Sequence, residues 1–239
     1  MIEDTFMASA IIVAAGEGSR MKGPTRKQYL ELSGRPVLSY SLATFDTCTL
    51  IEEIFLVVPK KDIDACQHKI ISALDLKKKV HLISGGVHRQ DSVYNGLLSV
   101  GKQPDIVSGI VVIHDGVRPF VRPEDLTACI RCAKKVGACI LGTPASDTLK
   151  RVDKSQKIEK TLDRKNIWLT QTPQAFKYDL IMEAHEAARR DGVIGTDDAA
   201  LVERLGKDVK IIEGNRYNIK ITVKEDLAVA HALIDAALV

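Results

Sequence analysis

Short runs of Ile, Val, Leu and Ala alternate along this chain with segments of helical periodicity, and this alternation limits the possible folds. The apolar runs lie at residues 10–14, 54–58, 80–83, 110–113 and 138–141. They are nearly continuous in apolar residues, as expected of strands buried on both faces of a sheet. Apolar residues at three- and four-residue spacing predict helices between them. These helical patterns cover residues 37–45, 63–74, 90–100 and 124–135. The alternation predicts an α/β fold with a doubly wound, mostly parallel sheet.

The pattern changes after Pro144. Residues 148–152 and 157–162 alternate around a polar turn, which predicts a hairpin. The hairpin is heavily charged and cannot bury a face of its own, so we expect it to project as an arm at about 145–166 and to pack on a second copy. Further helices are predicted at 178–190, 197–205 and 225–238, and short strands at 209–212 and 219–222. No repeat or flexible linker divides the chain, so we predict a single domain over 1–239.

Composition excludes several classes of function. The 239 residues include 34 basic and 31 acidic side chains, and the net charge of +3 is too small and too dispersed for a nucleic-acid partner. No apolar run reaches the ~18 residues of a membrane helix. Glu3 and Asp4, rather than basic residues, precede the first apolar run, so no signal peptide is predicted. An odd count of 5 cysteines favours reduced thiols and a cytoplasmic protein.

A glycine-containing loop follows the first predicted strand. It reads AAGEGSRM from residue 14 to residue 21, and Lys27 follows shortly after. Its two glycines let the backbone approach a ligand and offer N–H groups to phosphate. Met21 replaces the third glycine of a dinucleotide-binding loop, and no Walker lysine follows. With Arg20 and Lys27 the loop suits a triphosphate. A dinucleotide-dependent dehydrogenase and a non-catalytic nucleotide-binding protein stay open as alternatives on the loop alone.

Six further motifs follow the loop. They are GGVHRQDSV from residue 85, HDGVRP from 114, DT from 147, QTPQ from 171, TDDA from 196 and NIK from 218. In this order the motifs resemble those of the 2-C-methyl-D-erythritol 4-phosphate cytidylyltransferase family, which belongs to the sugar- and polyol-phosphate nucleotidyltransferases. The ribitol-5-phosphate cytidylyltransferases share most of these motifs and are the alternative within the class.

The resemblance implies transfer of a cytidylyl group from CTP to 2-C-methyl-D-erythritol 4-phosphate, with release of pyrophosphate, in non-mevalonate isoprenoid precursor synthesis. The nucleophile is then a phosphate oxygen, which is largely ionised at neutral pH, so no general base is required. Cations should carry the catalysis instead. By similarity, Arg20 and Lys27 hold the triphosphate and stabilise the transition state, while Arg164 and Lys220 position the attacking phosphate.

The resemblance also assigns the binding residues. Contacts to CTP are implied at Ala14, Ala15, Gly16, Gly18, Gly85, Gly86 and Ser92. Contacts to the polyol phosphate are implied at Asp115, Arg118, Thr148 and Thr172. Cytosine presents an exocyclic amine, so backbone carbonyls in these loops and the Ser92 hydroxyl are expected to accept from it. The position after the glycine pair is often acidic in the family but is Val87 here, so no side-chain contact is assigned to it.

Magnesium and a second subunit complete the expected site. Mg²⁺ should bridge the phosphate oxygens, because it binds through few protein ligands and many substrate oxygens, and Asp115 is the candidate protein ligand. The family uses the arm for dimerisation, which would place Thr148 and Arg164 in the partner's site of a homodimer. From the residue pattern alone, Asp115 equally suits a cap of the following turn. Residues 196–198 are predicted to start a helix capped by Thr196.

Overall fold

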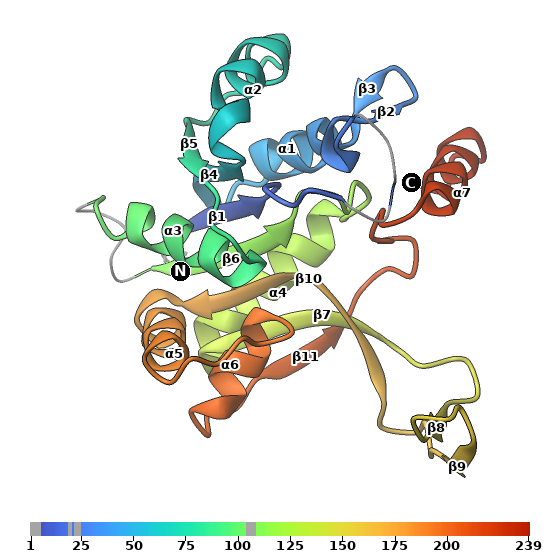
Figure 1. The fold of residues 1–239 in the computed structure, drawn as a ribbon. Helices are drawn as coiled ribbons and strands as arrows, with labels where there is room; N and C mark the ends of the chain where they lie inside the picture. The colour runs from blue at the N-terminus through green and yellow to red at the C-terminus, as the bar shows by residue number, and fades with distance from the viewer. Residues whose placement is uncertain (1–5, 19–20, 22–24, 104–108) are drawn as a thin grey trace, which may run out of the picture.

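The protein is built around a central seven-stranded sheet (Figure 1), in a computed structural model that describes residues 6–18, 21, 25–103 and 109–239. The strand order is β11-β7-β10-β6-β1-β4-β5. The strands are β1 (Ala8–Val13), β4 (Ile51–Val58), β5 (Val80–Ser84), β6 (Ile110–Asp115), β7 (Ala138–Pro144), β10 (Trp168–Lys177) and β11 (Lys210–Glu213). Neighbours pair in parallel except at β10, which is antiparallel to both β6 and β7. The predicted mostly parallel sheet is confirmed.

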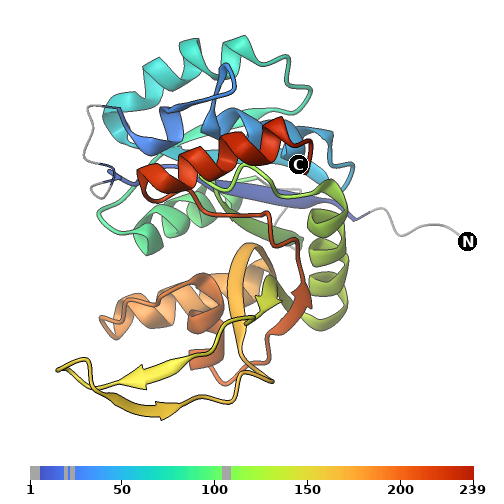
Figure 2. The same cartoon turned by 90° about the vertical axis from the view of Figure 1, so that its right-hand side faces the viewer.

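Helices cover both faces of this sheet (Figures 1 and 2). They are α1 (Val37–Thr47), α2 (Ile63–Lys69), α3 (Arg89–Val100), α4 (Pro123–Val136), α5 (Tyr178–Arg190), α6 (Asp198–Arg204) and α7 (Lys224–Asp235), with short 3₁₀ turns at Lys27–Tyr29, Lys60–Asp62 and Ile71–Ala73. Helices α1, α2 and α4 share one buried apolar cluster with the sheet, and α3, α5 and α6 share the other. Ile12 of β1 belongs to the first cluster and Ile11 to the second, because successive side chains of a strand point to opposite faces. Burial on both faces explains the unbroken apolar runs of the sequence.

The predicted arm is a hairpin that projects away from the sheet (Figures 1 and 2). Strands β8 (Lys150–Val152) and β9 (Ile158–Thr161) pair antiparallel, and all of their residues are exposed. The Asp153 carboxylate closes the turn by accepting hydrogen bonds from the backbone N–H groups of Ser155 and Lys157. A hairpin without a buried face depends on contacts from elsewhere for its stability.

Two parts of the second half differ from the sequence prediction. The strand predicted at residues 219–222 is wrong: the segment is irregular, although the Ile221 N–H still donates to the Val117 carbonyl at 2.9 Å. Strand β10 is absent from the sequence prediction, and it contains Pro173, a residue that cannot donate a backbone hydrogen bond to a neighbouring strand. The register shifts between Thr170 and Gln174, so Pro173 lies in an irregular stretch of β10.

A third apolar cluster joins α7 to the pairing of β2 (Glu31–Leu32) with β3 (Arg35–Pro36) and to the loop after β6. The segment that precedes α7 is thereby fixed beside the ends of β1 and β6, and it carries Lys220. Among the described residues, none of the helices has the length and apolar composition that a membrane-spanning helix requires.

Candidate functional site

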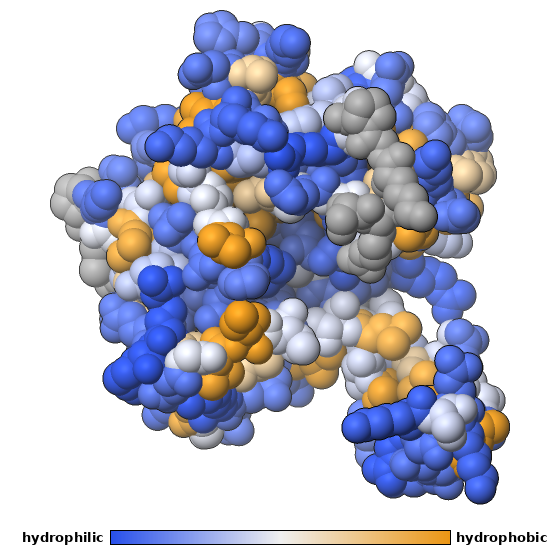
Figure 3. Space-filling view, in the orientation of Figure 1, coloured by the Kyte–Doolittle hydropathy of each residue, from blue (hydrophilic) through white to orange (hydrophobic). Residues whose placement is uncertain are grey.

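A pocket of about 780 Å³ opens at the carboxyl ends of β1, β4, β5 and β6. Figure 3 shows it as a hollow with mostly hydrophilic residues around it. Strand β1 lies between β4 and β6. The chain continues from β1 to β4 on one side and later adds β6 on the other side, so the strand order reverses at β1. Open α/β sheets bind ligands at the carboxyl ends of the strands at such a reversal. Nine of the predicted site residues line it together: Ala14, Ala15, Gly16, Lys27, Gly85, Gly86, Ser92, Asp115 and Lys220.

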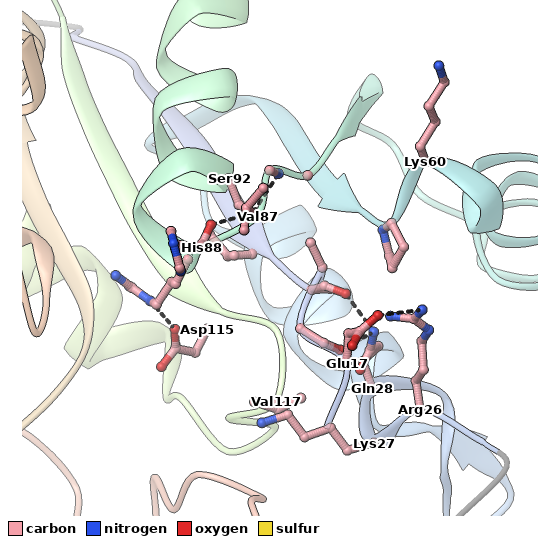
Figure 4. Close-up of a pocket in the computed structure, with 18 of the residues that line it drawn as sticks. Glu17, Arg26, Lys27, Gln28, Lys60, Val87, His88, Ser92, Asp115 and Val117 are labelled. Carbon is pink, nitrogen blue, oxygen red and sulfur yellow. Dashed lines mark hydrogen bonds and ion pairs between the residues drawn. The ribbon is translucent and has the colours of Figure 1, made fainter. Parts of the chain in front are cut away.

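The pocket concentrates positive charge that the overall composition does not reveal. Among the described residues, its walls carry six lysine and arginine side chains, namely Arg26, Lys27, Lys60, Lys61, Arg89 and Lys220, and two carboxylates, those of Glu17 and Asp115. Figure 4 shows Lys27 extending toward the part of the pocket where Asp115 lies, whereas Lys60 extends away from both. Such a surface favours a polyanionic ligand.

The buried side chain of Gln28 fixes the glycine loop after β1. It is 1% exposed, and its amide donates to the carbonyl of Ala14 at 2.7 Å and to that of Gly16 at 3.3 Å. These bonds tie the loop to the 3₁₀ turn that carries Lys27, so loop and cation are placed together. Gly18 adopts a φ of 68°, which favours glycine, but does not line the pocket. Arg20 lies outside the described residues.

The glycine pair after β5 lets a second loop lie against the first. A Cβ on Gly85 would lie 2.3 Å from the Cβ of Ala15, so only glycine fits at this approach. The Gly86 N–H donates to the Ser92 hydroxyl at 3.1 Å, which ties the pair to the first turn of α3. The side chain of Val87 is 90% exposed, so the departure from the family's acidic residue falls at the rim of the pocket.

Asp115 ends β6 and lies at the centre of the basic groups. Its side chain is 8% exposed, and its two oxygens accept from the Arg89 Nε at 3.0 Å and the Lys220 Nζ at 2.7 Å. The Arg118 Nε is 3.8 Å away. Burial alone would raise the pKa of Asp115, but the charges of Arg89, Lys220 and Arg118 outweigh burial and hold it well below its usual range. The carboxylate therefore stays ionised, with Arg89, Lys220 and Arg118 as its charged partners.

Arg89 is a pocket residue that is not among the predicted site residues. It lines the pocket and bridges Asp115 to a second buried carboxylate, that of Asp198, whose Oδ2 accepts from its Nη1 at 2.8 Å. Burial opposes its charge, yet the two carboxylates raise the pKa of Arg89. The sequence signal that could have identified Arg89 is its position in the GGVHR motif, five residues after the end of β5, which ends at the same edge of the sheet as β6. Lys60 and Lys61, which follow β4 at that edge, were missed in the same way.

Arg118 and Thr172 lie behind the pocket rather than in its lining. The Arg118 guanidinium donates to the Asn218 carbonyl at 2.8 Å, which anchors the segment that carries Lys220. The Thr172 hydroxyl is buried and accepts from the Asp115 N–H at 3.0 Å. Arg118 thus holds the segment of Lys220, and Thr172 holds the backbone of Asp115, from outside the pocket lining.

The sequence profile of the 2-C-methyl-D-erythritol 4-phosphate cytidylyltransferases matches residues 8–236. The chain belongs to this family. It is 45% identical over 228 residues to the 2-C-methyl-D-erythritol 4-phosphate cytidylyltransferase of Pelotomaculum thermopropionicum, covering 95% of this chain and 94% of that protein. It is 46% identical to the enzyme of that name from Syntrophus aciditrophicus, over 94% of both chains.

Solved structures agree with the family assignment. The crystal structure of 4-diphosphocytidyl-2C-methyl-D-erythritol synthase from Anaerococcus prevotii matches with a TM-score of 0.85 and 35% identity, covering 97% of each chain. The 2-C-methyl-D-erythritol 4-phosphate cytidylyltransferase of Thermus thermophilus matches with a TM-score of 0.76 and 31% identity, covering 96% of this chain and all of that one. The α/β fold of this chain is thus that of the cytidylyltransferase family.

The two arm residues expected in a cytidylyltransferase site do not reach this pocket. Thr148 and Arg164 stand at the base of the hairpin and are absent from the lining. The Arg164 guanidinium donates to the Ser146 carbonyl of the same chain. Within one described chain, the pocket is therefore formed without them.

A magnesium site made by protein side chains alone does not fit the described residues, which contain no cluster of three or more His, Cys, Asp or Glu side chains suited to a metal. Asp115, the candidate ligand, already accepts from Arg89 and Lys220. The pocket fits a magnesium ion that keeps its waters and arrives on phosphate oxygens, since such an ion needs few protein ligands.

Proposed function

We propose that the protein transfers the cytidylyl group of CTP to 2-C-methyl-D-erythritol 4-phosphate, giving CDP-methylerythritol and pyrophosphate, in non-mevalonate isoprenoid precursor synthesis. The observation that carries this proposal is the convergence of two glycine loops, Lys27 and the Lys220–Asp115 pair on one pocket of a chain that belongs to the cytidylyltransferase family.

The chemistry requires charge placement rather than proton transfer. A phosphate oxygen of the polyol phosphate attacks the α-phosphorus of CTP, the bond from that phosphorus to the bridging oxygen breaks, and pyrophosphate leaves. The nucleophile is ionised at neutral pH, so no base is needed. Lys27, with Arg20, would hold the triphosphate and neutralise charge on the five-coordinate phosphorus. Lys220, with Arg164, would hold the attacking phosphate. Mg²⁺ bound by the phosphate oxygens would supply further neutralisation.

The remaining site residues divide between the two substrates in this proposal. The backbone around the loop and the glycine pair, with Ser92, would hold the cytidine. Asp115 would accept a hydrogen bond from a polyol hydroxyl, since each carboxylate oxygen can accept more than the one bond it already makes. Arg118 and Thr172 would support this contact, and Thr148 would complete it from a partner subunit.

A homodimer formed through the arm belongs to the same proposal. Exposed apolar side chains lie on the hairpin and on the adjoining end of β10, where Val152 is 47%, Ile158 58% and Leu169 55% exposed. Apolar groups on a projecting hairpin favour burial against a second copy. Dimerisation would also place the base of each arm beside the pocket of the partner subunit. Thr148 and Arg164, which lie at that base, would then line the partner's pocket.

A cytoplasmic location is part of the proposal as well. The five cysteines are unpaired, and four of them are buried. Reduced thiols of this kind are typical of proteins in a reducing compartment.

The test is release of pyrophosphate from CTP with a panel of polyol phosphates. We expect turnover with 2-C-methyl-D-erythritol 4-phosphate and Mg²⁺. Robust turnover with ribitol 5-phosphate and none with methylerythritol phosphate would assign the protein to the ribitol-phosphate enzymes instead. A thermal shift measurement tests the other class of function, because a ligand of the native state raises the melting temperature. Stabilisation by NAD(P)H but not by CTP with Mg²⁺ would favour a dinucleotide enzyme.

A further inference from the structure

A second buried acid stands behind the pocket, at Asp198, the first residue of α6. Its side chain is 1% exposed and makes two charged or polar contacts. One oxygen accepts from the Arg89 Nη1 at 2.8 Å, and the other lies 3.1 Å from the Nε2 of His185, a residue of α5 that is fully buried. A carboxylate removed from water in this way is costly unless it is fully paired, so its presence requires an explanation.

Capping of α6 does not supply that explanation. The threonine cap predicted at Thr196 is wrong: the cap of α6 is Asp197, whose Oδ1 accepts from the Ala200 N–H at 2.9 Å. The Asp197 Oδ2 accepts from Gln174 at 2.8 Å. The start of the helix is therefore complete without the carboxylate of Asp198, which points to Arg89 instead.

The contacts form one continuous chain from the pocket into the core. Lys220 bonds one oxygen of Asp115, Arg89 bonds the other, and the far side of the Arg89 guanidinium bonds Asp198, which His185 holds in turn. Arg89 is thus gripped at two different nitrogens, Nε and Nη1. A guanidinium is a planar fork, so two fixed nitrogens set the orientation of the whole group.

These two contacts fix the orientation in which the Arg89 guanidinium binds Asp115. Without a partner at Nη1, the arginine side chain could turn its fork toward Asp115 or extend into the open pocket. Asp198 also supplies a charge that balances Arg89, because three cations surround the single carboxylate of Asp115. The carboxylate of Asp198 therefore keeps Arg89 from engaging Asp115 more fully or from competing for the anionic substrate.

We infer that Asp198, held by His185, is a positioning residue: it orients Arg89, and through Arg89 it fixes the Asp115 carboxylate for the polyol of the acceptor substrate. This inference rests on the proposed function, since it concerns the acceptor half of the same pocket. It assigns no contact with substrate to Asp198 or His185. Its consequence is selective: binding of the polyol phosphate should depend on Asp198, and binding of CTP should not.

The first experiment compares Asp198→Asn with Asp125→Asn. Asp125 is a matched control because it is also buried and arginine-bound, accepting from Arg122 at 2.8 and 2.7 Å, but it lies on α4 and does not line the pocket. Asn keeps the shape but removes the negative charge that binds Arg89 and His185, so we expect the KM for methylerythritol phosphate to rise on the order of tenfold in Asp198→Asn. The KM for CTP should change less than about twofold. Asp125→Asn should leave both KM values near wild type.

A merely structural role gives a different result. Loss of folded protein lowers the apparent kcat and leaves both KM values unchanged, and an equal rise in both KM values would indicate general damage to the pocket. Either result would overturn the inference. If Asp198→Asn does not fold, His185→Gln decides the question, because it loosens Asp198 without removing its charge. It should raise the same KM in the same direction, and an unchanged KM would count against the positioning role.

A double substitution tests the route through Asp115. If Asp198 acts by way of Asp115, adding Asp198→Asn to Asp115→Asn should raise the KM for the polyol phosphate no further, because coupled residues are non-additive. Additive effects would show an independent action and overturn the inference. Failure of the proposed function is distinguishable from both outcomes, since the wild-type protein itself would then release no pyrophosphate with methylerythritol phosphate.

Discussion

At the scale of single residues, the position of Lys27 shows how one cation is aimed without a long structured element. The 3₁₀ turn that bears it is anchored by Gln28, which is buried and bonded to two carbonyls of the glycine loop. Loop and cation are therefore held in one arrangement by these bonds. The ammonium group of Lys27 is thus already in position when a triphosphate binds to the loop, and electrostatic catalysis depends on such preorganised charges.

Replacement of this cation should reduce the rate rather than the fold. Lys27→Ala is expected to lower kcat by a factor on the order of 10² or more, as when a group that stabilises transition-state charge is removed. Arg20→Ala is expected to act similarly. Steady-state pyrophosphate release measures both, with Lys207→Ala, an exposed lysine outside the pocket, as the control. An unchanged kcat in Lys27→Ala, with only KM raised, would show that the lysine binds substrate and transition state equally.

His114 carries a second prediction at this scale, on stability. Burial lowers the pKa of His114 to about 4, although the negative charge of Asp115 acts in the opposite direction and favours the protonated imidazole. In the unfolded chain the imidazole of His114 takes up a proton near pH 6.5, whereas in the folded chain it stays neutral until about pH 4. The free energy of unfolding should therefore fall by roughly 3 kcal/mol as the pH drops from about 6.5 to 4. Asp115 and Asp198, whose pKa values are lowered, lose their stabilising effect only at lower pH.

Denaturant unfolding at pH 7 and pH 4.5 measures this loss. His114→Gln cannot take up the proton, so its free energy of unfolding should change less between the two pH values than that of the wild type. The two proteins differ only at residue 114, so the difference between their pH dependences isolates the contribution of His114. Equal pH dependence in the two proteins would mean that His114 is protonated in the folded state.

At the scale of elements, the two loops that flank the pocket are fitted to one another, and the fit predicts a rescue. Gly85→Ala would place a methyl group 2.3 Å from the Cβ of Ala15, so the loops must separate. We expect the KM for CTP to rise at least about tenfold. Ala15→Gly removes the opposing atom, and the double variant should recover most of the affinity. No recovery would place the clash elsewhere, at Ser92 or Val58, whose atoms lie 3.2 and 3.4 Å from the same position.

The sequence predicted the elements well where periodicity was strong and failed where polar chemistry entered a strand. The buried runs of β1, β4, β5 and β6 are apolar because both faces are covered, so their pattern is unmistakable. Strand β10 carries Gln171, Thr172 and Gln174, whose side chains are buried and hydrogen-bonded near the pocket. Those residues obscure the apolar pattern of a buried strand. The QTPQ motif is therefore visible in the sequence, whereas the strand that contains it is not, because buried polar side chains stand where apolar ones would mark a strand.

The same limit applies to the pocket. Glycine loops and cations near strand ends could be predicted, because the sheet edge that gathers them follows from the strand order. The pairing of Arg89 with both Asp115 and Asp198 could not, since it joins residues 26 and 109 positions apart and depends on how α3 and α6 pack. Contacts of this range are fixed by tertiary packing, which a local sequence pattern does not contain.

At the scale of the whole molecule, the arm separates two of the proposed catalytic and binding residues from the pocket they should serve. Thr148 and Arg164 lie at the base of a hairpin that stands apart from the sheet (Figure 1), so a single chain holds an incomplete set. A symmetric dimer would supply the missing residues twice, because each arm would reach the pocket of the other chain. The proposed active unit is therefore the dimer, and its two sites would be composite.

Mixed dimers test this arrangement directly. Lys27→Ala and Arg164→Ala should each be nearly inactive alone. If the sites are shared, a mixed dimer contains one site with both residues altered and one with both intact, the latter pairing Lys27 of one chain with Arg164 of the other. Random exchange at equal amounts makes half of the dimers mixed, so about a quarter of wild-type activity should return. Subunit exchange must be verified by isolating the mixed dimer through two different affinity tags. A purified mixed dimer without activity would mean that each site takes Lys27 and Arg164 from one chain, and the arm would then have to fold back onto its own pocket when substrate binds.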